Sequence, residues 1–240
     1  MYDVFMSSCD GFPRTKITDI ITTTKSGIDL APSHLDLVGA DPYLYRMENR
    51  AGVLKAALDD VRTRYDYIFI DTPPSMGQLV INGLYAADHV IVTLDSGSFA
   101  LDGVATLSTI FSDMKSDLKK DVRPDLAIIS RWGEGSKPDA ARKKTVQGTD
   151  LISRIRSLLF KKPEPTPEEK RAAEEQKTEH ERLQAMLTEA KRLFPAVLTV
   201  PFSPIVYDAQ KHGLPISHFA PESSAGAAYK AIADEVMKWN

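Results

Sequence analysis

The stretch YDYIFIDTPP, residues 65–74, decides the fold that we expect. Tyr67–Ile70 is a short apolar run, which is the pattern of a strand covered on both faces. Asp71 follows at the carboxyl end of this run, where open α/β sheets bind their ligands. Pro73 and Pro74 cannot extend a ladder of backbone hydrogen bonds, so we expect the strand to end there. The pattern predicts a nucleotide-type site, and the alternative is a strand that simply ends in an aspartate.

The composition is typical of a globular protein with one substantial core. The chain has 240 residues, of which 42% are hydrophobic and 26% charged, and its net charge is −3. Its single cysteine, Cys9, excludes an intrachain disulfide framework and favours a reducing compartment. The five histidines are far apart in sequence, which argues against a zinc site. Because no long apolar run or secretory pattern is present, we expect a cytoplasmic protein that has no membrane partner.

Strand-like and helix-like segments alternate along the chain. We expect strands at 28–32, 67–71, 89–94 and 126–129, and helices at 47–64, 76–87 and 99–118. Such alternation predicts an α/β fold with a mostly parallel sheet and flanking helices. We expect residues 1–240 to form a single α/β domain.

Several further motifs follow the first in a fixed order. They are residues 65–75, 80–84, 86–88, 90–92, 99–103, 200–202, 209–216 and 221–236. Together they resemble the ParA/MinD family of deviant Walker P-loop ATPases, and within it the ParA-type partition proteins of chromosomes and plasmids. The resemblance covers most of residues 28–130 and 196–236.

This resemblance implies a nucleotide-dependent function in DNA segregation. In the family, ATP lies between two subunits, and the dimer binds nonspecific DNA and a ParB-like partner protein. The resemblance implies that Asp71 holds Mg²⁺ through water and that the loop Thr72–Gln78 senses the γ-phosphate. Asp208 stands where the family usually has glutamate. The nucleotide-binding residues that it implies are Asp71, Thr72, Pro73, Pro201, Phe202, Ser203 and Asp208.

One family motif is missing from these 240 residues. A P-loop needs glycines, a lysine and a following Ser or Thr to hold phosphates, and the nearest cluster, GEGSKP at 133–138, has the wrong spacing. We therefore expect a P-loop NTPase-like fold that is incomplete at its N-terminus, with residues 1–27 as candidates to fill the place beside strand 67–71. We expect this chain alone not to hydrolyse ATP. The alternatives are a partition ATPase whose sequence begins late, an inactive ParA-like binding module, or a structural fragment.

Residues 131–162 are unusually basic. They contain nine Lys or Arg and three Asp or Glu, a local charge of +6. A phosphate-binding patch is one interpretation, since nonspecific DNA binding is mainly electrostatic, and a solvated face on a core-packed helix is the other. The candidate DNA-binding residues are Arg142, Lys143, Lys144, Arg154 and Arg156.

Residues 163–194 look like a charged helical insertion. Three prolines open the segment, and Thr166, Pro167 and Glu169 have the spacing of a capping box. An apolar stripe begins only at Leu183, so the turns before it have nothing to bury. A solvated arm and a partner-binding surface are the two interpretations.

Overall fold

The computed structural model describes residues 1–73, 77–96, 100–133 and 181–239. By the contacts among its residues, the chain forms two compact units. Unit 1 comprises Met1–Val92 and Asp102–Leu126, and unit 2 comprises Thr93–Leu101 and Ala127–Asn240. That residues 1–240 form a single domain stays a prediction.

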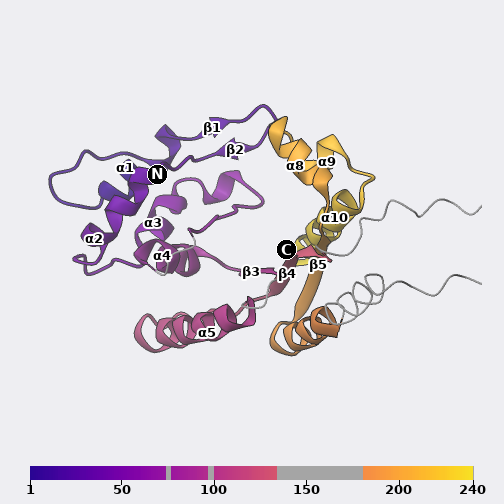
Figure 1. The fold of residues 1–240 in the computed structure, drawn as a ribbon. Coiled ribbons are helices and arrows are strands. Elements are labelled where there is room, and N and C mark those ends of the chain that lie inside the picture. The colour runs from indigo at the N-terminus through magenta and orange to yellow at the C-terminus, as the bar shows by residue number, and fades with distance from the viewer. Residues whose placement is uncertain (74–76, 97–99, 134–180, 240) are drawn as a thin grey trace, which may run out of the picture. The chain divides into compact units, whose positions relative to one another are not determined.

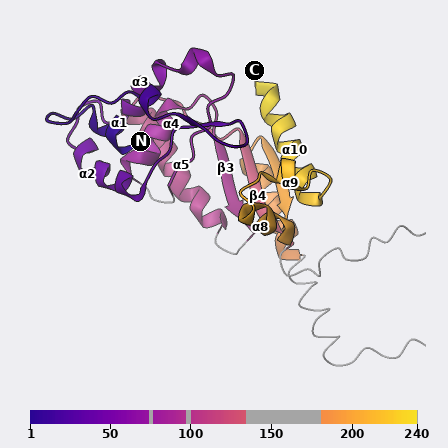
Figure 2. The ribbon, with the colours of Figure 1, turned by 90° about the horizontal axis from the view of Figure 1, so that it is seen from above.

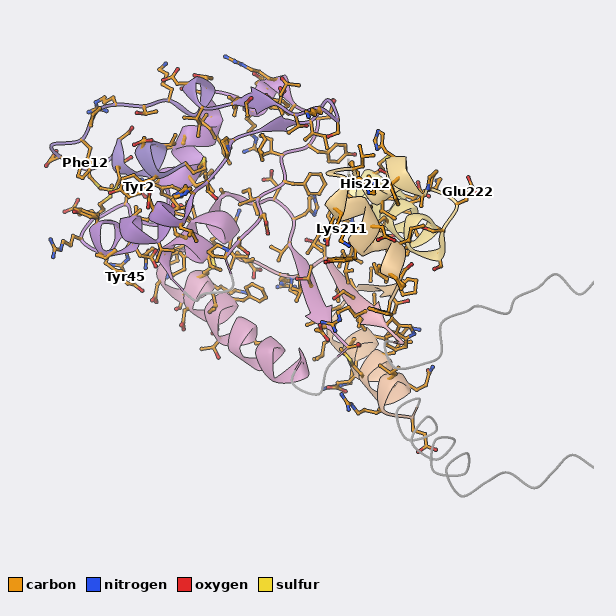
Figure 3. All side chains as sticks on the ribbon, turned by 45° about the horizontal axis from the view of Figure 1, so that its top comes forward. Tyr2, Phe12, Tyr45, Lys211, His212 and Glu222 are labelled. Carbon is orange, nitrogen blue, oxygen red and sulfur yellow. The ribbon has the colours of Figure 1, made fainter. Side chains whose placement is uncertain are left out.

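Unit 1 is built mainly from short helices (Figure 1), several of which enclose an apolar core. Its elements are α1 (Tyr2–Met6), the 3₁₀ helix η1 (Ile17–Asp19), β1 (Thr22–Thr23), β2 (Asp29–Leu30), η2 (Leu35–Ala40), α2 (Asp41–Leu44), α3 (Val53–Asp59), η3 (Arg62–Arg64), α4 (Gln78–Ala86) and most of α5 (Ala100–Asp117). The first core cluster contains Phe5, Met6, Ala40, Leu44, Val53, Leu54 and Leu79. Tyr2 and Phe12 pack against this cluster (Figure 3). The cluster therefore joins α1, η2, α2, α3 and α4.

Three strands form a parallel sheet, most of which belongs to unit 2. Its strands, in the order β3-β4-β5, are Ile91–Asp95, Leu126–Trp132 and Ala196–Pro201. The helices of unit 2 are α8 (Pro204–Lys211), α9 (Ile216–Phe219), α10 (Ser224–Val236) and η4 (Met237–Trp239), together with helical residues 181–193. Helix α10 packs against β5 (Figure 2). The predicted α/β class with flanking helices is confirmed.

Most of the predicted elements are present. The helices expected at 76–87 and 99–118 are α4 and α5, and the strands expected at 89–94 and 126–129 are β3 and β4. The helix expected at 47–64 is only the seven-residue α3, which is followed by η3. Of the insertion expected at 163–194, the structure describes residues 181–194. There the buried side chains are Leu183, Met186, Ala190 and Phe194, close to the expected stripe.

The prediction of a buried strand at 67–71 is wrong. Within the part of the chain that the structure describes, the segment has no strand partner, and Phe69 is 73% exposed. Residues 1–27 do not fill the place beside it, because β1 pairs antiparallel with β2, with Thr22 opposite Leu30. Among the described residues, no backbone group of 67–71 has a hydrogen-bond partner. An apolar run becomes a strand only when a neighbouring ladder satisfies its N–H and C=O groups.

We expect the exposed run 67–69 to promote self-association, because unpaired backbone beside apolar side chains is a template for intermolecular pairing. Replacing Phe69 by lysine should lower the concentration-dependent increase in sedimentation coefficient. Leu35→Lys is the control, because Leu35 is 84% exposed but belongs to η2, whose backbone is helical. Equal sedimentation of the parent protein and Phe69→Lys at every concentration would contradict this expectation.

Candidate nucleotide site

Unit 1 anchors the segment that leads to Asp71 at both ends. The Tyr65 hydroxyl donates a hydrogen bond of 2.8 Å to Asp29 Oδ2 on β2. The pKa of Asp29 lies below its ordinary value because its carboxylate accepts hydrogen bonds, with the larger effect from Thr23 and the smaller from Tyr65. The same bond to Asp29 raises the pKa of Tyr65. Ile70 packs against the first core cluster. The segment is therefore fixed by its side chains instead of by a sheet.

Asp71 and Thr72 are exposed at the end of this segment, and Pro73 is half-buried. The Thr72 side chain lies close to α4 at Gly83, where an added Cβ would lie 3.0 Å from Thr72 Cγ2. The carboxylate of Asp71 and the hydroxyl of Thr72 are oxygen donors, the ligands that Mg²⁺ accepts while it keeps several waters. No group of three or more metal-ligating side chains gathers in the described part of the chain. Asp71 therefore fits a Mg²⁺ held mainly by water and substrate phosphates.

The N-terminus of α4 is capped from another helix. Asp41 Oδ1 accepts a hydrogen bond from Leu79 N at 3.2 Å, and an added Cβ at Gly77 would lie 2.2 Å from Asp41 Oδ2. Gln78 is buried, and its Oε1 is the one buried side-chain oxygen without a partner among the described residues. The residues that follow the Asp71 loop are thus held by a carboxylate that sequence reasoning did not single out.

Asn82 connects α4 with the start of α3. Its side chain is fully buried. Oδ1 accepts from Leu54 N at 3.1 Å, and Nδ2 donates to Arg50 O at 2.7 Å and to Gln78 O at 2.9 Å. Its position within the motif at 80–84, where Asn82 stands between apolar residues, was the only sequence signal for this role.

Unit 2 gathers polar groups at the carboxyl edge of its sheet. Ser96, which follows β3, donates a hydrogen bond of 3.0 Å to Arg131 O, and the Arg131 guanidinium lies 3.7 Å from the Asp95 carboxylate. Arg131 has a φ of 55°, a left-handed conformation that costs a non-glycine residue free energy. Such strain at the ligand-binding edge of a parallel sheet marks a candidate functional position. The sequence did not reveal it, because backbone conformation has no sequence signature here.

Four of the residues implied to bind nucleotide belong to the end of β5 and to the α8 segment that follows it. β5 ends at Pro201, and Phe202 N donates a hydrogen bond of 3.0 Å to Trp132 O at the end of β4. Phe202 is 46% exposed, and Ser203 is the N-cap of α8 without a capping bond from its side chain. Asp208 is exposed on α8. These residues offer an aromatic face and polar oxygens to a ligand.

The far end of α8 is also exposed. Lys211 Nζ lies 4.4 Å from the centre of the Tyr207 ring, and His212 Nδ1 is 2.8 Å from Asp208 O. Figure 3 labels Lys211 and His212 where α8 ends. Both contacts join residues of α8 or its C-cap, so they stabilise the last turn of this helix.

The remaining predicted residues belong elsewhere or lie outside the described structure. Asp71, Thr72 and Pro73 belong to unit 1, whereas Pro201, Phe202, Ser203 and Asp208 belong to unit 2. The five candidate DNA-binding residues between 142 and 156 lie outside the described residues. None of the helices in the described part of the chain has the length and apolar character needed to cross a bilayer.

One family model and several known proteins are similar to this chain. The model, described as an AAA domain, matches residues 1–124. The sporulation initiation inhibitor protein Soj of Bacillus subtilis is 27% identical over 237 residues, which are 98% of this chain and 75% of Soj. The chromosome partitioning protein ParA of Myxococcus xanthus is 38% identical over 105 residues, 44% of this chain and 37% of that protein.

Two further similarities concern length and fold. The chain matches an uncharacterized protein of Mycobacterium tuberculosis at 27% identity over 226 residues, 94% of this chain, and spans only 58% of that relative's length. The ATP complex of a Cyanothece McdA variant has the same fold, with a TM-score of 0.66 at 17% identity over 98% of this chain and 74% of McdA. Since the family model covers more than half of the chain, the chain belongs to the ParA/MinD-type family of P-loop ATPases.

Proposed function

We propose that this chain acts as a ParA-type, partition ATPase-like protein that binds DNA and a ParB-like partner under the control of Mg²⁺ and ATP. The observation that carries the proposal is the placement of Asp71 and Thr72. Both are exposed, and they follow a segment anchored by Tyr65 and Ile70. The similarity to Soj over 98% of the chain supports the same assignment.

The proposal gives separate roles to residues of unit 1 and to residues of unit 2. In unit 1, Asp71 orients water around Mg²⁺, and the loop Thr72–Gln78 responds to the γ-phosphate. In unit 2, Pro201, Phe202 and Ser203 lie along adenine, and Asp208 accepts hydrogen bonds beside them. Mg²⁺ would neutralise charge on the phosphates when it is bound. A homodimer would carry each of these sets of residues twice.

The test of this proposal is Mg²⁺-dependent nucleotide binding by the full 240-residue chain. Replacing Asp71 by asparagine should weaken the binding of a fluorescent ATP analogue about tenfold when Mg²⁺ is present, which is about 1.4 kcal/mol. With EDTA in place of Mg²⁺, the substitution should have little effect, since only the metal-linked contact is lost. Fluorescence titration with and without Mg²⁺ measures both values.

Asp66→Asn is the matched control for this measurement, because Asp66 is also exposed and lies five residues before Asp71. The two variants carry the same charge change. Equal affinities of both variants and the parent in Mg²⁺ would contradict the role of Asp71. Nucleotide-independent DNA binding by the parent would instead favour an inactive binding module, and loss of both activities would favour a structural fragment.

DNA binding, if carried by the basic segment 131–162, should be weak, nonspecific and sensitive to salt. Each phosphate contact contributes about −0.9 to the slope of log affinity against log salt concentration on duplex DNA. Replacing Arg142, Lys143 and Lys144 by glutamate should therefore reduce the steepness of this slope by about 2.7. Fluorescence anisotropy with two unrelated duplexes over a range of salt concentrations measures it.

Glutamate at Lys170 and Arg171 provides the control, because four glutamates at 168, 169, 174 and 175 surround this pair in sequence. These substitutions should leave the slope unchanged. If the triple variant binds as tightly as the parent, the segment is a solvated face and does not bind DNA.

A further inference from the structure

The loop that follows Asp71 is attached at its C-terminal end by a contact from a distant part of the chain. Gly77 is the N-cap of α4 and has no side chain with which to cap the helix. Asp41, in the first position of α2, takes that role and accepts from Leu79 N at 3.2 Å across 38 residues. A carboxylate at this position also faces the positive end of the α4 dipole. The cap of α4 is therefore supplied by a different helix.

The fit between Asp41 and Gly77 leaves no room for a side chain. A Cβ at Gly77 would lie 2.2 Å from Asp41 Oδ2 and 3.1 Å from its Cγ. Contacts shorter than 3.0 Å to a Cβ essentially never occur, so any larger residue would displace the carboxylate. The glycine is required by this close approach, since its backbone conformation, with a φ of −114°, is open to every residue.

Asp41 cannot move independently of the core. Leu44, on the same short helix, is fully buried in the first core cluster together with Leu79 of α4. Asn82 and Asp41 bind different backbone groups of the first turn of α4. Asn82 holds the carbonyl of Gln78, and Asp41 holds the N–H of Leu79. Loss of Asp41 would therefore leave an N–H group at the first turn without its partner.

We propose that Asp41 is a positioning residue for the Asp71 loop. It fixes the C-terminal end of the loop at Gly77, while the packing of Ile70 and the approach of Thr72 to Gly83 fix its beginning. This inference rests on the proposed function, in which the loop between these two ends responds to the phosphate of a nucleotide. Asp41 holds Gly77 and the first turn of α4 in place. Without it, the free energy of nucleotide binding must also order the loop end.

The test compares three substitutions in the full chain, namely Asp41→Ala, Asp41→Asn and Gly77→Ala. Asp36→Asn is the matched control, because Asp36 is exposed on η2, where it pairs with His34. Backbone NMR gives the first readout. In Asp41→Ala and Gly77→Ala, the Leu79 amide should exchange about tenfold faster, as loss of an N-cap contact predicts. The heteronuclear NOE at Thr72 and Gly77 should fall, and Asp41→Asn should keep intermediate values since its amide oxygen can still accept.

Affinity for a fluorescent ATP analogue with Mg²⁺ gives the second readout. It should fall about fivefold in Asp41→Ala and be partly restored in Asp41→Asn. A change at Leu79 alone, with parental NOE values at Thr72 and Gly77, would show a helix cap without a positioning role and overturn the proposal. Unchanged affinity in a variant whose NOE values have fallen would do the same. If the parent protein binds no nucleotide, the proposed function fails, and the positioning role is decided by the NOE values.

Discussion

Replacing Asn82 by alanine is expected to lower the free energy of unfolding of unit 1 by about 3–4 kcal/mol. The Asn82 side chain is fully buried and makes three hydrogen bonds to backbone groups, at 3.1 Å, 2.7 Å and 2.9 Å. Alanine removes all three and leaves Leu54 N–H, Arg50 C=O and Gln78 C=O without this partner. The bonds to Leu54 N–H and Gln78 C=O are buried, and a buried group costs about 1–3 kcal/mol when it is unpaired; Arg50 is exposed, so its carbonyl contributes less.

Hydrogen exchange of the α3 and α4 amides in denaturant measures this loss. Tryptophan fluorescence is less suitable, because Trp132 and Trp239 both belong to unit 2. Asn49→Ala is the control, since Asn49 is exposed in the same unit and should change the stability by about 0.5 kcal/mol or less. A loss below 1 kcal/mol for Asn82→Ala would mean that the three backbone groups find other partners.

The second large effect is expected at Gly226, where alanine should destabilise unit 2 by about 2–3 kcal/mol. An added Cβ would lie 2.4 Å from Pro221 O and 2.5 Å from Ala220 O. Both are backbone atoms, so the clash cannot be relieved by a side-chain rotation. The Gly226 N–H donates to the N-cap hydroxyl of Ser223 at 3.0 Å, and alanine keeps this donor, so the expected loss comes from the clash alone.

Urea unfolding followed by tryptophan fluorescence reports on this unit. Ser223→Ala separates the cap from the clash, because it removes only the capping bond and should cost about 1 kcal/mol. Equal stabilities of Gly226→Ala and Ser223→Ala would argue that the chain between Pro221 and Gly226 relaxes at little cost.

Local pattern was enough to predict α4, α5, β3, β4 and the α/β class. In these elements the apolar spacing and the turn residues agree with the tertiary environment, as for Ile110 and Met114, which pack in one core cluster. The order of motifs was likewise sufficient for the family, because each motif is a short run of neighbouring residues.

Only the tertiary structure decided the state of residues 67–71. Their apolar run is a strand pattern, but strand pairing is a contact between distant segments, and no described strand lies beside this one. The contacts of Asp41 with Leu79 and of Asn82 with Leu54 join residues 38 and 28 positions apart, so no local spacing indicates them. The sequence by itself determined α4, α5, β3, β4 and the alternation of strands and helices. The tertiary structure decided which buried polar groups are paired and which backbone remains open, because both depend on what the rest of the chain places beside them.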